Sequence, residues 1–295
     1  MKSRFVSIAI IVGLLFLFAG AGFCQEKVSM NEWVEKVGQG SVNWSAGYIE
    51  AVGIGAPSDK SIGKANARPM AMRAAKVDAY RNLLEITKDV QVDSATTVKD
   101  FTVESDVINT QVNGLVKGAQ VVKTDYMSDG TVEVTLRIPL YGGILAQTIM
   151  PLAIAKPPVP PAPSVLEAPA PAVTAPAAPA APVAYTGMVV DARGIQARPA
   201  MSPRVFDEDG KEVYGSANVD REYAVQQGMS GYARDLNAAQ SNQRVTVNPI
   251  TVKALKTSGP GKSDLIISNA DAQQIRASAE NMTFMKKCRV MVVLD

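Results

Sequence analysis

Hydrophobic residues in the first half of the chain recur with two periods, one typical of strands and one typical of helices. Residues 42–55 are rich in β-branched and aromatic side chains and end in glycines, which predicts a strand. Residues 67–87 have a helical period with Pro69 near the first turn, which predicts an amphipathic helix. Its buried stripe is expected to contain Met70, Ala74, Val77, Tyr80 and Leu84. Its solvated face is expected to carry Arg73, Lys76 and Arg81.

The rest of this half completes a small domain. Residues 90–103 favour one or two short β segments, and residues 120–140 favour two strands joined by a turn at Ser128, Asp129 and Gly130. Between them, residues 106–119 have a second helical stripe through Ile108, Val112, Leu115 and Ala119. The order β, α, β, α, β, β predicts an α+β domain with helices packed on a mainly antiparallel sheet.

The second half predicts another α+β domain. Strands are expected at residues 185–194, 244–257, 263–268 and 289–295, and a hairpin at residues 202–215 turns at Glu208, Asp209 and Gly210. A helix is expected at residues 224–240, although two glycines weaken it, and another at 269–287 with Asn269 or Asp271 as its cap.

A Pro/Ala-rich segment, residues 156–184, separates the two halves. Such a composition cannot build a core and favours extended polyproline-like structure, so it predicts a semi-rigid linker. The expected domains are therefore residues 25–155 and 185–295. The linker suits a protein that bridges two partners, and it suits a passive tether equally well.

Residues 1–24 have the features of a secretory signal peptide. Lys2 and Arg4 precede an apolar run, and small residues follow at 19–22. Cleavage could follow Ala21 or Cys24. Cys24 is also a candidate for lipidation. Phe23 argues against this, because a bacterial lipobox has a small residue at that position. The chain is expected to be exported, in the periplasm or associated with the outer membrane, with peripheral membrane attachment as an alternative.

Charge and side-chain chemistry argue against several classes of function. Removing the signal leaves 28 basic residues against 28 acidic ones, so no electrostatic footprint for nucleic acid is expected. The chain has no histidine, which removes the commonest general base and zinc ligand. We therefore expect neither an enzyme nor a cofactor or metal. Cys288 is interpreted as a buried strand residue, with a reactive or intermolecularly paired thiol as the alternative.

Three motifs resemble chemical sites and are interpreted as structural. The run Gly261-Lys262-Ser263 matches the last three residues of a phosphate-binding loop motif. The first glycine of that motif is missing and a strand follows instead of a helix, so a hairpin turn is expected. The acids Asp207, Glu208 and Asp209 lack further ligands at calcium-loop spacing. Asp191 and Arg193 favour an ion pair that closes a turn. A hydrolase that uses Asp191, Asp207 or Asp209 is the remaining enzymatic alternative.

The first domain resembles a known family at residues 68–86, 96–101, 112–122 and 129–140. These read RPMAMRAAKVDAYRNLLEI, TTVKDF, VNGLVKGAQVV and DGTVEVTLRIPL. Together they are similar to the small outer-membrane lipoprotein family, typified by a surface lipoprotein of about twenty kilodaltons, and to the N-terminal domain of flagellar assembly protein T. The resemblance covers residues 43–150 and implies an envelope protein without known catalysis.

These observations favour a non-catalytic exported envelope protein that acts as a structural or assembly factor. The resemblance extends this to the flagellar basal body, with envelope proteins, flagellar ring components or further copies of the chain as partners. The alternative is a periplasmic binding module for peptidoglycan or another envelope ligand.

Overall fold

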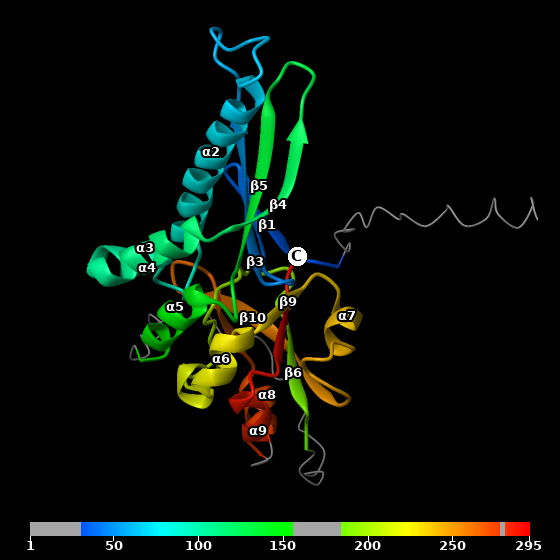
Figure 1. The fold of residues 1–295 in the computed structure, drawn as a ribbon. Helices are drawn as coiled ribbons and strands as arrows, with labels where there is room; N and C mark the ends of the chain where they lie inside the picture. Colours follow the sequence, from blue (N-terminus) through cyan, green and yellow to red (C-terminus); the bar gives the residue numbers. More distant parts are fainter. Residues whose placement is uncertain (1–30, 156–183, 278–280) are drawn as a thin grey trace, which may run out of the picture. The chain divides into compact units, whose positions relative to one another are not determined.

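The computed structural model describes residues 31–155, 184–277 and 281–295. The predicted signal peptide with Cys24, and all of the predicted linker except Ala184, lie outside the described residues. The described chain forms two α+β domains, residues 31–155 and 184–295, as the sequence predicts (Figure 1).

The first domain is built on a five-stranded antiparallel sheet in the order β1-β2-β3-β5-β4. Its strands are β1 (Val34–Val37), β2 (Gly40–Asn43), β3 (Tyr48–Gly55), β4 (Gln120–Tyr126) and β5 (Val132–Pro139). Its helices are α2 (Ala67–Asp89), α3 (Val98–Glu104), α4 (Asp106–Lys117) and α5 (Ile144–Ala155). Alternate residues of β5 are buried, as expected of a strand with one face on the core.

Helix α2 packs closely along β3 (Figure 1). A Cβ on Gly53 of β3 would lie 2.6 Å from the Cα of Ala79 and still closer to the backbone of Ala75 and Ala79. A Cβ on Gly55 would likewise collide with the helix backbone at Ala71. Glycine on the strand and alanine on the helix are therefore what allow the two elements to approach this closely.

This contact corrects the predicted stripe of α2. The buried face carries Ala71, Ala75, Ala79, Leu83, Ile86 and Thr87. Met70 is 49% exposed and Val77 is 53% exposed. The prediction was wrong at Met70, Ala74 and Val77, because beside Gly53 and Gly55 the strand leaves room only for the methyl groups of the buried alanines. Tyr80 and Leu84 are partly buried and pack against the core, as predicted. The exposed positions of Arg73 and Arg81 are as predicted.

Other predictions for the first domain need correction. Residues 42–55 form parts of two strands, because the chain turns at 44–47, where Gly47 has a φ of +74°. Residues 98–104 are helical instead of extended. A capping box between Thr97 and Asp100 starts this helix, since each side chain accepts from the other residue's backbone N–H. Strand β1 and helix α5 were not predicted.

The second domain contains a seven-stranded mixed sheet in the order β8-β7-β11-β10-β6-β12-β9. Its strands are β6 (Gly187–Asp191), β7 (Val205–Phe206), β8 (Glu212–Tyr214), β9 (Gly231–Ala233), β10 (Pro249–Ser258), β11 (Asp264–Ile267) and β12 (Val290–Val293). Its helices are α6 (Arg221–Gln227), α7 (Leu236–Gln240), α8 (Asn269–Arg276) and α9 (Asn281–Lys286), with the 3₁₀ turn η1 (Ser216–Asn218). The β7/β8 and β10/β11 pairs are antiparallel and the others are parallel.

The predicted strands and hairpin of this domain are present, whereas its helices differ from the prediction. Residues 224–240 form the end of α6, strand β9 and helix α7, because Gly228 adopts a φ of +77° and ends the first helix. The cap of α8 is Ser268, whose hydroxyl accepts from the amide of Asp271.

One cluster of buried hydrophobic residues contains members of both domains, including Trp44, Leu136, Tyr214 and Tyr232. The two domains therefore contribute to a common core.

Within residues 31–155, 184–277 and 281–295, no helix is long and apolar enough to cross a bilayer.

Replacing Gly53 by Ala should lower the free energy of unfolding by about 3 kcal/mol, the upper end of the usual overpacking cost, because the methyl group meets helix backbone that cannot rotate away. Gly114→Ala is the matched control. A Cβ there meets nothing within 4 Å, and alanine inside α4 should raise stability by about 1 kcal/mol. Equilibrium denaturation measures both variants. A Gly53→Ala variant as stable as the parent would contradict the close contact.

Candidate functional site

Backbone hydrogen bonds join the two domains at the loop that follows α2. The amides of Met201 and Ser202 donate to the carbonyls of Gln91 (3.0 Å) and Val92 (2.7 Å). The amide of Gly261 donates to the carbonyl of Ser94 at 2.7 Å. The second domain is thus fixed against the first through main-chain groups.

Tyr141, which follows β5, makes a second connection between the domains. Its ring lies against Gly228 so closely that a Cβ there would be 2.6 Å from the ring. The next amide, that of Gly142, donates to the carbonyl of Val225 in α6 at 2.9 Å. Beside it, the rings of Trp44 and Tyr232 meet edge to face with centroids 5.7 Å apart. An aromatic group from each domain therefore lies in this junction.

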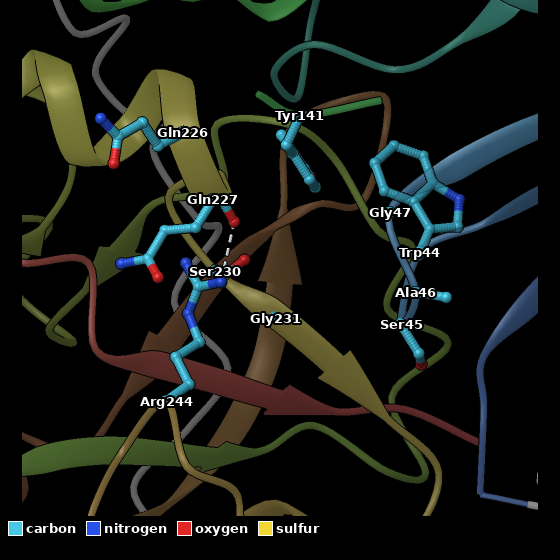
Figure 2. Close-up of a pocket in the computed structure, with 10 residues that line it drawn as sticks. All are labelled: Trp44, Ser45, Ala46, Gly47, Tyr141, Gln226, Gln227, Ser230, Gly231 and Arg244. Carbon is cyan, nitrogen blue, oxygen red and sulfur yellow. Dashed lines mark hydrogen bonds between the residues drawn. The ribbon is translucent and has the colours of Figure 1, made fainter. Parts of the chain in front are cut away.

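These contacts enclose a pocket of about 260 Å³ at the domain junction, named here the junction pocket (Figure 2). The first domain contributes Trp44, Ser45, Ala46, Gly47 and Tyr141, and the second contributes Gln226, Gln227, Ser230, Gly231 and Arg244. Gln226 is exposed, so the pocket reaches solvent along that side.

Arg244 is the charged group of the junction pocket. Its Nε donates to the carbonyl of Cys288 and its Nη1 to the carbonyl of Gln227, each at 2.8 Å, and its Nη2 donates to the carbonyl of Gly228. Burial lowers the pKa of this guanidinium from its usual value. No carboxylate lies within ion-pair distance of it in the part of the chain that the structure describes. The cation is held by carbonyl dipoles and its charge is not neutralised by a side chain.

Two buried hydroxyls of the junction pocket have no hydrogen-bond partner among the described residues, those of Tyr141 and Ser230. Ser230 lies near enough to the Tyr232 hydroxyl to affect the pKa of that phenol, but no hydrogen bond of normal geometry joins the two side chains. The Tyr232 hydroxyl instead donates to the carbonyl of Ala200 at 2.7 Å and accepts from the amide of Ala200 at 2.9 Å. Burial raises the pKa of Tyr141 and Tyr232, the latter to about 12, so both phenols remain protonated near neutral pH. The junction pocket therefore offers a cation and neutral hydrogen-bond donors, and neither phenol can act as a base near neutral pH.

A second polar cluster lies where Ser94 meets the other domain. The Ser94 hydroxyl donates to the Asp264 carboxylate at 2.5 Å, and the amide of Arg204 donates to the same carboxylate at 3.3 Å. Burial raises the pKa of Asp264, which the Ser94 hydrogen bond and the Arg204 charge only partly offset. Burial also raises the pKa of Glu212, the other carboxyl beside Arg204. Both carboxyl groups are therefore easier to protonate than in water, and Asp264 is the one that contacts the first domain.

The residues singled out from the sequence are dispersed over the second domain and make structural contacts. Arg193 Nε binds Asp191 at 2.8 Å, and this hydrogen bond lowers the pKa of Asp191 to about 2, so the predicted ion pair is confirmed. Burial by itself would raise the pKa of Asp207, but hydrogen bonds from Arg276 and the Lys211 amide outweigh it and lower the pKa. Neither acid lines the junction pocket.

The predicted turns are confirmed as well. Residues 259–263 connect β10 to β11, and residues 207–211 connect β7 to β8. Glu208 accepts from the amide of Asn269 at 3.0 Å. Among residues 31–155, 184–277 and 281–295, no three acidic or cysteine side chains gather in a way that could hold a metal ion.

Cys288 is buried, as predicted, but it precedes β12 with a φ of +52° instead of lying within a strand. Burial raises the pKa of its thiol to about 11, which leaves very little reactive thiolate at neutral pH. Its carbonyl, which binds Arg244, is its contribution to the junction pocket.

Sequence reasoning missed Tyr141, Ser230 and Arg244, the three polar groups that converge in the junction pocket. Tyr141 precedes the linker, whereas Ser230 and Arg244 follow it, so about ninety residues separate Tyr141 from Ser230 and no motif spans the three. A local signal existed only for Tyr141, an aromatic residue directly after a strand and before Gly142 and Gly143.

Comparison with known proteins concerns the second domain. Residues 187–295 match a protein-family model described as the second domain of Treponema pallidum Tp0624. The match begins at β6 and includes Ser230 and Arg244 but not Tyr141. No curated protein matches the chain. Because the name of that family model gives no activity, function has to be inferred from the geometry.

Acidification should strengthen the docking of the domains through Asp264. A folded-state pKa raised above the unfolded value gives a contribution to stability that is complete below about pH 4 and is lost as the pH rises through the folded-state pKa. The melting temperature of the parent minus that of Asp264→Asn should therefore decrease between pH 4 and pH 7. Asp209→Asn, in the exposed β7/β8 turn, is the control. A difference that rises with pH would contradict the assignment.

Proposed function

We propose that this chain is a non-catalytic exported envelope protein that works as a structural or assembly factor and associates with further copies of itself through strand β4. A place in the flagellar basal body is the extension that the resemblance of residues 43–150 suggests. The observation that carries the proposal is the uncovered edge of β4.

Strand β4 ends the first sheet, and within the described chain it pairs only with β5. Val121 is 45% exposed, Val122 is 42% exposed and Tyr126 is 53% exposed. A long edge strand with apolar side chains is an aggregation hazard unless a partner strand covers it. Strand addition would pair the free backbone groups and bury these side chains together.

The sequence of β4 is complementary to itself in one antiparallel register. If two copies pair about Thr124, Lys123 of each copy lies opposite Asp125 of the other. Lys123 and Asp125 are 2.7 Å apart within one strand, so they share a face of the sheet. Opposite charges that face each other stabilise an antiparallel ladder. A β-bulge between Val121 and Lys123 limits the regular ladder to the residues that follow it.

The chemistry of the junction pocket supports a role without catalysis. Its phenols stay protonated, and its guanidinium is bound to three carbonyls. The Cys288 thiol beside it is also protonated near neutral pH. These groups can bind a molecule, but they supply neither a base nor a nucleophile at neutral pH.

Charge exchange across β4 tests the self-association. Lys123→Asp places like charges opposite each other, and so does Asp125→Lys, so each purified variant should sediment as the monomer at concentrations where the parent associates. A mixture of the two variants restores opposite charges and should associate again. Lys99→Asp, an exposed change on α3, should behave as the parent does. A monomeric parent, or a mixture that stays monomeric, would refute this interface.

Export and assembly are tested in the cell that makes the chain. Fractionation with mass spectrometry should find the chain in the periplasm or outer membrane, with an N-terminal peptide that begins after residue 21 or 24. Enrichment in isolated basal bodies would support the flagellar extension. An uncleaved chain free in the cytoplasm would exclude the envelope role.

A periplasmic binding module for peptidoglycan or another envelope ligand is the second candidate. The junction pocket favours it, because a cation and two unpartnered hydroxyls face one solvent-accessible space.

A further inference from the structure

We propose that the junction pocket binds a single carboxylate group, held by Arg244, Tyr141 and Ser230. This inference does not depend on self-association through β4. It names the chemistry that the second candidate function would recognise.

The guanidinium of Arg244 is fixed in place, and not all of its N–H donors are hydrogen-bonded. Three backbone carbonyls hold Nε, Nη1 and Nη2, one bond to each nitrogen. A guanidinium has five N–H groups, so one remains on each terminal nitrogen. A desolvated cation without a counterion is costly, and a bound anion would remove that cost. The carbonyl bonds orient the remaining donors before any ligand arrives.

The two hydroxyls belong to residues that line the same pocket as Arg244. Figure 2 shows Ser230 beside the Arg244 guanidinium and Tyr141 on another side of the pocket. Both hydroxyl oxygens are buried and have no partner among the described residues. Six other buried polar side-chain atoms among the described residues also lack a partner, but only these two line one pocket beside Arg244. Because buried polar groups are usually hydrogen-bonded, their meeting in one pocket indicates a missing partner there.

A purely structural role explains only part of this arrangement. Arg244 binds the last carbonyls of α6, as a cation at a helix C-terminus commonly does, and this accounts for its bonds to Gln227 and Gly228. It does not account for the two hydroxyls or for a cavity of about 260 Å³ beside them. A ligand that accepts hydrogen bonds accounts for all three observations.

Charge and donor number favour a carboxylate over a phosphate monoester. The two remaining N–H groups and the two hydroxyls make four donors, and a carboxylate has about four lone-pair sites. Its single negative charge equals the charge of Arg244, whereas a phosphate monoester carries more than one at neutral pH. A small organic acid and the C-terminus of a peptide share this chemistry, and either could enter along the side open at Gln226.

Calorimetric titration of the purified full chain tests the site with four probes: N-acetylglycine, the peptide acetyl-Gly-Gly-Ala with a free C-terminus, the same peptide as its amide, and inorganic phosphate. The free acids should bind, and the amide and phosphate should not. Tighter binding of the peptide acid would identify a chain terminus as the source, and tighter binding of N-acetylglycine would identify a small acid.

Tyr141→Phe and Ser230→Ala separate binding from folding. Each removes a hydroxyl without a partner, so the melting temperature should stay equal or rise, while the affinity for the acid that binds best should fall by about tenfold, the usual effect of losing one hydrogen bond to a charged group. Tyr223→Phe, an exposed change on α6 outside the pocket, should bind as the parent does.

The inference is overturned if neither acid binds at tens of millimolar, if the amide or phosphate binds as well as the acids, or if both hydroxyl variants keep the parent's affinity. Sedimentation of the same samples records self-association separately. A chain that associates through β4 but binds no acid would therefore refute the carboxylate site alone.

Discussion

The packing of α2 against β3 is the constraint on which the rest of the structure depends. Gly53 and Gly55 have no side chains to separate the strand from the helix, so the alanines of α2 rest on the strand backbone. This contact fixes β3 against the helix, and β5 pairs with β3 along its whole length. The end of β5 then places Tyr141 at the junction with the second domain. A packing detail inside one domain thus determines where a polar group of the junction pocket lies.

The sequence predicted the fold class and most strands correctly, because alternating residues such as Val132, Val134 and Leu136 follow directly from a sheet with one buried face. The predicted stripe of α2 was wrong in its first half, since a pattern based on side-chain size cannot anticipate a helix that buries alanine and exposes Val77. The junction pocket could not be predicted at all. Its groups come from two domains, and only the docked structure brings them together.

The β4 edge and the junction pocket differ in the interaction that would stabilise a bound partner. The edge carries exposed Val121, Val122 and Tyr126 and free backbone groups, so association there would bury apolar area. The pocket contains a cation whose charge is not neutralised, and binding there would relieve an electrostatic cost. Burial raises the pKa of Asp264, which accepts from Ser94 of the other domain, so protonation of this carboxyl is expected to affect the docking of the domains. Burial of apolar area, compensation of a buried charge and protonation of a buried carboxyl therefore all concern the same two-domain unit.

Each domain provides half of the lining of the junction pocket, which has a thermodynamic consequence. A molecule that needs both halves binds only the docked arrangement, so its binding and the docking equilibrium are linked by mass action. The coupling is reciprocal: occupancy shifts the population toward docked domains, and any force that separates the domains weakens occupancy by the same free energy. Mechanical load across the two domains and the concentration of a small ligand would then both shift the equilibrium between docked and separated domains.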